Sequence, residues 1–282
     1  MGMPEGIKII DALVMENRPG PGSGKGSRHR HGDIENQIPG YRERFLKGTT
    51  IDEMVAIMDE VGIEKAMLEV GAYSADFGQD SGLKAVEKYP DRFSAWCSDL
   101  AVNPHEGMGA VRKLQRLVSD FGVKFFEPMP GRVRLPPNDK QYYPLYYKCI
   151  ELGIPVVINV GIPGPHDPAW LQDPIHLDEV CWFFPDLRVV MCHIGEPWQF
   201  MCVKLMLKWP NLYYMTSAFA PKHYPGEIIY YMNTRGADKV MFASGYPIID
   251  FRRAALELKD LPLRDHVWPK FVRENAIKVF KL

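Results

Sequence analysis

Short apolar runs alternate with longer segments of helical periodicity along the whole sequence, and no other feature constrains the fold as strongly. Eight runs have the β-branched and aromatic residues of buried strands; they cover residues 8–14, 65–70, 93–98, 123–127, 155–160, 188–192, 212–215 and 239–242. A helical segment follows each run. Eight βα units in 282 residues predict one α/β domain over residues 1–282, a (β/α)₈ TIM barrel with an extra C-terminal helix and a long loop after the first strand.

The long loop after the first strand covers residues 17–40 and contains six glycines and the sequence His29-Arg30-His31. Connections longer than about 12–15 residues are uncommon in compact domains. We therefore expect a lid over the active site, hinged at its glycines. His29 and His31 could also hold a metal, but a glycine-rich loop beside the cations Arg28 and Arg30 is poorly preorganised for that role. A loop that is solvated or touches the substrate is the favoured interpretation.

Charge and hydropathy exclude several classes of partner. The formal net charge is −1, with 34 Lys and Arg against 35 Asp and Glu, which gives no basis for binding nucleic acid or an anionic membrane. No apolar run approaches the roughly 18 residues of a membrane helix, and the first residues lack the apolar segment of a signal peptide. The five cysteines are unclustered, which is typical of reduced, buried thiols. We expect a cytoplasmic protein.

A histidine stands at the end of the sixth predicted strand. His193 follows the β-branched run, and Gly195 and Pro197 then open the next helix. In a barrel of this type, a residue at the carboxyl end of a strand faces the loops that form the active site. A core histidine satisfied by backbone groups is the alternative. The position favours a catalytic acid or base.

Four motifs resemble the amidohydrolase-related family, in the branch that contains aminocarboxymuconate-semialdehyde and resorcylate decarboxylases. They are His193-Ile-Gly-Glu-Pro-Trp198, residues 142–156, residues 239–247 and Glu274-Asn-Ala276, and they occur in the family's order and spacing. The resemblance covers essentially the whole chain. It implies a barrel enzyme in which His193 is the acid–base residue, and a homodimer or a larger homo-oligomer.

The chain departs from this family at every metal-ligand position. Members with a metal begin with Asp-x-His-x-His; here Asp11 is retained, whereas Leu13 and Met15 replace the two histidines. Asn159 replaces the histidine of the fifth strand, and Gly245 replaces the aspartate of the eighth. Leu, Met and Gly side chains offer nothing to Zn²⁺, and one amide is a poor ligand. We therefore expect no metal and no other cofactor, and the family has precedent for metal-independent lactone hydrolysis.

Polar residues at the predicted strand ends give three further candidate catalytic groups, Glu69, Glu127 and Asn159. A carboxyl group in an apolar barrel mouth has a raised pKa, which suits a general acid or base. A structural salt bridge with an Arg or Lys on the rim is an equally open interpretation for either glutamate. The Asn159 amide could orient a carbonyl group or stabilise an oxyanion.

Five residues are candidates for substrate binding. Arg132 and Arg134 follow the fourth strand, and guanidinium groups bind carboxylates through paired hydrogen bonds. An exposed rim position is at least as compatible with both arginines. Asp99 and Ser217 are predicted at strand ends, and Trp198 closes the histidine motif.

These patterns predict an enzyme that acts on a small carboxylated metabolite and hydrolyses a lactone or a similar C–O or C–N bond, with His193 as general acid or base. A metal-free lyase, either a decarboxylase or a dehydratase, is the second interpretation. A non-catalytic relative that binds a ligand is the third. The vacated metal positions favour the third interpretation, whereas the retained His193 and the strand-end carboxylates argue against it.

Overall fold

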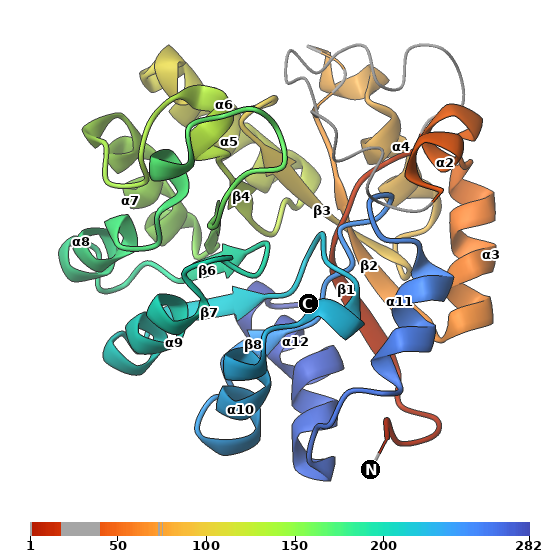
Figure 1. The fold of residues 1–282 in the computed structure, drawn as a ribbon. Coiled ribbons are helices and arrows are strands. Elements are labelled where there is room, and N and C mark those ends of the chain that lie inside the picture. Colours follow the sequence, from red (N-terminus) through yellow and green to blue (C-terminus); the bar gives the residue numbers. More distant parts are fainter. Residues whose placement is uncertain (1, 18–39, 73, 75) are drawn as a thin grey trace.

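The structure is a computed structural model that describes residues 2–17, 40–72, 74 and 76–282. Eight parallel strands form one sheet in the order β1 to β8, and Figure 1 shows them as a barrel surrounded by helices, which confirms the predicted fold. The strands are β1 Ile9–Val14, β2 Ile63–Glu69, β3 Phe93–Ser98, β4 Phe126–Glu127, β5 Val156–Asn159, β6 Val189–Cys192, β7 Leu212–Met215 and β8 Val240–Met241. Residues 18–39, with most of the expected lid and both loop histidines, lie outside the described residues.

The barrel closes where β1 meets the end of β8. Ala12 N donates a hydrogen bond to Phe242 O at 3.2 Å, and Ser244 N donates to Asp11 Oδ1 at 2.9 Å. Asp11 is fully buried, and burial raises the pKa of its carboxyl group to about 7, although hydrogen bonds from Ser244 and from Leu13 N oppose the change. Asp11 therefore joins the first strand to the segment that follows the last.

Helices surround the barrel on its sides and at one end. They are α2 Tyr41–Lys47, α3 Ile51–Val61, α4 Ser81–Lys88, α5 Met108–Phe121, α6 Pro130–Val133, α7 Tyr143–Leu152, α8 His176–Phe183, α9 Gln199–Lys208, α10 Gly226–Thr234, α11 Phe251–Leu258 and α12 Asn275–Phe280. Within the described ranges, none of these helices has the length and apolar character needed to cross a membrane.

The barrel interior is a packed core of apolar side chains. Strand residues alternate between the inside and the outside, except at the irregular end of β1. The interior set includes Ile10, Ala12, Leu13, Met67, Trp96, Phe125, Val157, Val190, Met215 and Met241. Helix α12 closes the amino-terminal end of the barrel, where the Phe280 ring lies 5.0 Å from the Phe125 ring and Phe125 stacks on Trp96 at 5.1 Å between centroids. With that end filled, the opposite end, at the carboxyl ends of the strands, is left as the mouth.

Two parts of the barrel differ from the predicted boundaries. Strand β4 has two residues where five were predicted. Pro155 has no N–H for the ladder, so the pairing of β4 with β5 is reduced to Phe126 with Val156, whereas two pairs join β4 to β3. The helix predicted over 265–280 is divided into a 3₁₀ turn, a π-helical turn and α12. The Asn275 amide donates to two carbonyl oxygens, of Ala237 at 2.8 Å and Val240 at 2.7 Å, and these tertiary bonds hold the segment against β8.

Candidate active site

Four polar residues are the last residues of their strands and lie at the barrel mouth. Glu69, Glu127, Asn159 and Cys192 are the last residues of β2, β4, β5 and β6. Each lies two positions after an inward-pointing residue of the packed interior, so the strand alternation points it inward as well. All four are almost completely buried, and the structure confirms the predicted positions of Glu69, Glu127 and Asn159.

Cys192 joins Glu127 to Asn159. Its Sγ atom lies 3.6 Å from Glu127 Oε1 and 3.4 Å from Asn159 Oδ1. Burial, followed by the charge of Glu127, raises the pKa of the Cys192 thiol well above its ordinary value, so the thiol keeps its proton and can donate to one of the two oxygens. Glu127 Oε2 is buried and has no hydrogen-bond partner among the described residues, so this atom is available to a reacting group.

Burial raises the pKa of Glu127 to about 8, and the charge of Glu69 adds to the effect. Burial also raises the pKa of Glu69, against a hydrogen bond from Ser98 and the charge of Arg132. One cation, the Arg132 guanidinium, therefore faces three buried carboxyl groups, those of Glu69, Asp99 and Glu127. The charge imbalance is relieved if Glu127 is protonated at neutral pH.

His193 lies beside this group because the chain turns sharply after β6. Its φ is 67°, in the left-handed region that few residues other than glycine adopt, so the side chains of Cys192 and His193 do not alternate as they would in a strand. Potential ligand atoms of Glu127, Cys192 and His193 all lie within 4.8 Å of one another. The left-handed turn thus brings an imidazole to the buried carboxyl group.

Ser217 orients the His193 ring. Nδ1 lies 2.9 Å from Ser217 Oγ and 3.4 Å from the Ser217 carbonyl oxygen, and His193 N donates to Ser217 Oγ at 3.3 Å. Burial lowers the pKa of His193 to about 4, with the bond to the Ser217 backbone opposing it. The residue is half-buried, and contact with water would bring its pKa nearer to the ordinary 6.5, so the ring is neutral at pH 7 in either case.

Arg132 is held by Asp99 at the side of the mouth. Its Nε and Nη2 atoms donate to the two Asp99 carboxylate oxygens, each at 2.7 Å, and Met129 N donates to Asp99 Oδ1 at 3.0 Å. Asp99 is 5% exposed, so this is a desolvated, bidentate pair. Both residues were predicted from sequence to bind substrate, and the structure pairs them with each other.

Two other residues predicted to bind substrate form no hydrogen bond with the buried glutamates among the described residues. Arg134 pairs with Asp167 Oδ1 at 3.0 Å, and its side chain is more than half exposed. Trp198 is half-buried and precedes α9, and its indole forms no hydrogen bond with the described residues. Substrate binding by these residues stays a prediction.

The family's metal positions do not fit a metal in this chain. Leu13 is buried in the packed interior and Met15 packs against the same cluster. Gly245 has φ 67°, and a Cβ atom there would lie 2.6 Å from Ala218 N, so the backbone itself has no room for the family's aspartate. Of these four positions, only Asn159 has a side-chain oxygen that could bind a metal, and this Oδ1 atom already contacts the Cys192 thiol.

Sequence reasoning missed Cys192, which it treated as a core residue with the other cysteines. The available signal was its position: it ends the same run as His193, two residues after the inward-pointing Val190. All five cysteines are indeed buried and free, but Cys192 alone contacts Glu127 and Asn159 among the described residues.

Comparison with known proteins assigns the family. The amidohydrolase family model matches residues 28–282, and the chain therefore belongs to the amidohydrolase family. No curated protein matches the sequence. An uncharacterised TIM-barrel protein from Bordetella bronchiseptica is 26% identical, with a TM-score of 0.77 over 97% of this chain and 98% of that one.

Two decarboxylases share the fold at lower identity. 5-Carboxyvanillate decarboxylase from Sphingomonas paucimobilis is 16% identical, with a TM-score of 0.70 over 98% of this chain and all of that one. Dihydroxybenzoic acid decarboxylase from Polaromonas sp. JS666, solved with manganese and 2-nitroresorcinol, is 20% identical, with a TM-score of 0.70 over 98% of this chain and 97% of that one.

Proposed function

We propose that this chain hydrolyses a C–O or C–N bond of a small carboxylated metabolite, with a lactone as the leading candidate, and that it does so without a divalent metal. Glu127 is the general acid and His193 the general base. One observation carries the proposal: the buried Glu127 carboxyl group, with Oε2 unpartnered among the described residues, lies within 4.8 Å of an imidazole held by Ser217. Burial raises the pKa of Glu127 to about 8 and lowers that of His193 to about 4. Between these values the carboxyl group holds a proton and the imidazole has a free lone pair, as an acid and a base require.

The separation of the two groups suits attack on one carbon atom. Their nearest polar atoms are within 4.8 Å, so both can reach oxygen atoms bonded to the same acyl carbon. If His193 Nδ1–H donates to Ser217, Nε2 keeps the lone pair and forms no hydrogen bond with the described residues. Nε2 removes a proton from water as the water oxygen bonds to the acyl carbon, and the carbonyl electron pair moves onto its oxygen.

The leaving group then departs with the Glu127 proton. As the carbonyl re-forms, the acyl C–O bond breaks, its electron pair stays on the leaving oxygen, and Glu127 supplies the proton to that oxygen. Asn159 faces Cys192 with its carbonyl oxygen, so its amide nitrogen is free to donate to the developing oxyanion. Proton transfer from the imidazolium back to Glu127 through exchanging water restores both residues.

Three neighbours support this chemistry. Cys192 holds Glu127 Oε1, and Ser217 fixes the imidazole ring. Arg132 gives two donor atoms to Asp99, which leaves Nη1 to bind a substrate carboxylate. A protonated Glu127 also spares an anionic substrate from repulsion at the reacting carbon.

Decarboxylation without a metal is the second candidate, favoured by the same protonated acid. The C–CO₂⁻ bond would break with its electron pair left on carbon, and Glu127 would protonate that carbon. The decarboxylases among the structural relatives motivate this alternative. It needs no activated water, so it leaves His193 without a role as a base.

The experiment is a turnover screen on metal-depleted protein with carboxylated lactones, amides and ortho-hydroxybenzoates. Hydrolysis of a lactone releases a proton, hydrolysis of an amide releases an amine, and decarboxylation releases CO₂, so the reactions are separable. We expect turnover of a lactone or an amide that chelators leave unchanged and that Glu127→Gln and His193→Asn each lower by at least about 10²-fold. Turnover that requires added metal would refute the proposal, and so would calorimetric binding of several substrates without any product.

A further inference from the structure

Three kinds of metal ligand meet at the barrel mouth, in a group formed by Glu127, Cys192 and His193. A carboxylate oxygen, a sulfur atom and an imidazole nitrogen lie within 4.8 Å of one another there. Within the described ranges, no other three His, Cys, Asp or Glu side chains are placed in this way. None of the three residues stands at one of the family's four metal positions, so this is a different site. We call it the Glu–Cys–His cluster.

The distances from Cys192 match the coordination geometry of zinc. Its Sγ atom is 3.6 Å from Glu127 Oε1 and 3.4 Å from Asn159 Oδ1. Tetrahedral Zn²⁺ binds sulfur at about 2.3 Å and oxygen at about 2.1 Å, which places these two ligand atoms about 3.6 Å apart. The His193 nitrogen has to approach the other two ligands by no more than about 1.5 Å. Because His193 is half-buried at the mouth, the ion can enter and keep a water as its fourth ligand.

Unpartnered oxygens at the cluster indicate a missing positive charge. Glu127 Oε2 and Glu69 Oε1 are both buried and have no hydrogen-bond partner in the part of the chain that the structure describes. The Arg132 guanidinium is committed to Asp99 and is the cation that acts on both glutamates. A divalent ion bound between Glu127 and the sulfur would supply the charge that this group of carboxyl groups lacks.

Ser217 supports the imidazole as an outer-shell partner supports a metal ligand. Histidines that bind a metal ordinarily donate their other ring N–H to a neighbouring group, which fixes the orientation of the ring. His193 Nδ1 lies 2.9 Å from Ser217 Oγ and 3.4 Å from the Ser217 carbonyl oxygen. With Nδ1 held in this way, Nε2 is left to bind the ion.

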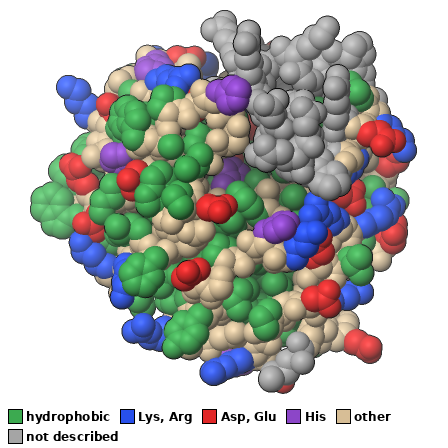
Figure 2. Space-filling model, viewed as in Figure 1, with side chains coloured by type: hydrophobic (Ala, Val, Ile, Leu, Met, Phe, Trp, Pro, Cys, Tyr) green, Lys and Arg blue, Asp and Glu red, His purple; other side chains and the backbone are tan. Residues whose placement is uncertain are grey.

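The mixture of ligand atoms selects zinc. Thiolate and imidazole ligands suit Zn²⁺, whereas Mg²⁺ and Mn²⁺ prefer sites made of oxygen atoms. Figure 2 shows acidic side chains interspersed with lysine and arginine over the visible face of the molecule, so the acids there are accompanied by positive charge. Zn²⁺ should therefore bind at the buried cluster in preference to that surface.

We propose that Glu127, Cys192 and His193 bind one Zn²⁺ ion and that this ion inhibits the enzyme. The thiol and carboxyl protons pass to water when the ion binds, and the two resulting anions balance its charge. The ion takes the lone pair of His193 and an oxygen of Glu127, so neither group can act as base or acid. The inhibition therefore rests on the proposed function, whereas the binding site does not.

Calorimetry of the metal-depleted full chain with zinc chloride tests the site. We expect one Zn²⁺ per chain. Cys192→Ser and His193→Asn should each weaken binding at least about 100-fold, because loss of an outer-shell partner alone costs about 10–100-fold. Ser217→Ala should weaken it about 10-fold or more for that reason. The other four cysteines remain in Cys192→Ser, so zinc bound to them would survive that substitution.

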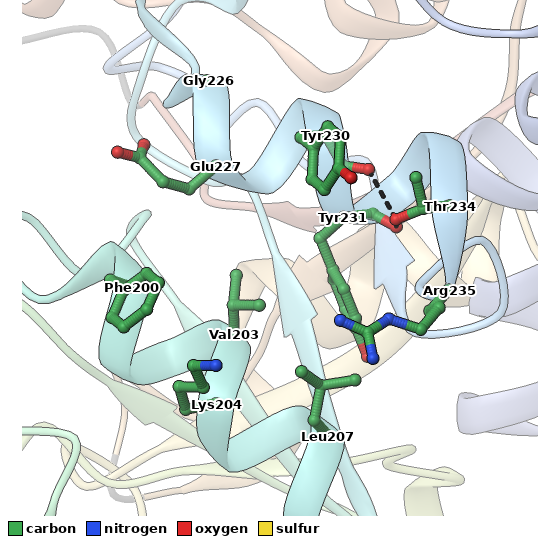
Figure 3. Close-up of a pocket in the computed structure, with 10 residues that line it drawn as sticks. All are labelled: Phe200, Val203, Lys204, Leu207, Gly226, Glu227, Tyr230, Tyr231, Thr234 and Arg235. Atoms are coloured by element: carbon green, nitrogen blue, oxygen red, sulfur yellow. Dashed lines mark hydrogen bonds between the residues drawn. The ribbon is translucent and has the colours of Figure 1, made fainter.

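A matched control comes from a glutamate on the outer wall of the barrel. Glu227 is exposed and lines an apolar groove of about 420 Å³ between α9 and α10, as Figure 3 shows. Glu127→Gln should weaken zinc binding at least about 100-fold, whereas Glu227→Gln should leave it unchanged. Thermal unfolding by circular dichroism checks that each variant is folded.

Cobalt identifies the sulfur ligand directly. Co²⁺ in place of Zn²⁺ should give the near-ultraviolet charge-transfer absorption of a cobalt–thiolate bond, and Cys192→Ser should remove that absorption. A chain that binds no Zn²⁺, or binds it equally well after Cys192→Ser, would overturn the site. So would bound Co²⁺ without a thiolate signal.

Inhibition is measured separately, with a substrate that the metal-depleted protein turns over. Saturating Zn²⁺ should lower turnover at least about 10²-fold, the contribution of a general acid or base, and a chelator should restore it. If Zn²⁺ binds through Cys192 but leaves turnover unchanged or raises it, the inhibitory role is overturned together with the acid and base roles of Glu127 and His193. Failure to bind, with turnover intact, overturns the zinc site alone.

Discussion

Replacing Glu127 by Gln should change the pH dependence of folding stability. In the folded chain Glu127 ionises at about pH 8, compared with an ordinary value of 4.5. Between these values the folded protein retains a proton that the unfolded chain releases, so the stability of the wild type falls as pH rises. Gln keeps the shape and cannot ionise. The variant should therefore become more stable relative to the wild type as pH increases.

The size of this gain follows from the two pKa values. Each pKa unit corresponds to about 1.36 kcal/mol, so full ionisation of Glu127 disfavours the folded state by about 5 kcal/mol, of which about 1 kcal/mol is already present at pH 5. The difference in unfolding free energy between Glu127→Gln and wild type should thus grow by about 4 kcal/mol from pH 5 to pH 9. Asp11 and Glu69 also have raised pKa values, but both proteins contain them, so the difference isolates Glu127 to first order.

Urea unfolding at pH 5, 6, 7, 8 and 9, extrapolated to water, measures the difference. Glu87→Gln on the exposed side of α4 is the matched control and should follow the wild type at every pH. Parallel stability curves for Glu127→Gln and wild type would refute the assignment of a protonated Glu127. If Glu127→Gln were instead less stable than the wild type, and most so at high pH, Glu127 would be ionised and paired with a cation in the folded protein.

Three further predictions follow from the same site. His193→Asn should keep the fold and lower kcat about 10²–10⁴-fold with little change in KM, and a variant that unfolds but stays active in its folded fraction would make His193 a structural residue. Asp99→Asn should cost about 3 kcal/mol in urea unfolding, because it leaves the Arg132 guanidinium largely buried without its bidentate partner, and a cost near zero would show that water replaces the pair. Gly245→Asp should destabilise the fold by at least about 2 kcal/mol and fail to bind Mn²⁺ in calorimetry, and tight binding would show that the backbone yields at this position.

The parts of the site that were predictable from sequence depend on strand alternation alone. Once eight strands are counted, Glu69, Glu127, Asn159 and Ser217 fall near strand ends, and parallel strands bring those ends together. His193 was found in the same way, with its family motif as support.

The parts that were not predictable depend on contacts between distant segments. Arg132 and Asp99 belong to different βα loops, 33 residues apart, and nothing local indicates that each neutralises the other. Cys192 was missed because its role depends on the left-handed turn at His193, which places consecutive side chains on one side. The length of β4 was overestimated because Pro155, which precedes β5, removes a hydrogen bond from the adjacent strand β4. The residues of β4 themselves give no sign of this loss.

The plug formed by α12 has a consequence for the order in which the protein is completed during synthesis. Phe280 supports Phe125, Phe125 supports Trp96, and the Trp96 indole donates to Met67 O at 2.9 Å, so one chain of contacts links the last helix to the second strand. The interior of the barrel stays uncovered at one end until residue 280 has left the ribosome. The part of the chain before Asn275 therefore keeps apolar surface exposed at that end until the last helix is in place. A chain ending before Asn275 should bind a hydrophobic dye strongly, whereas the full chain should not.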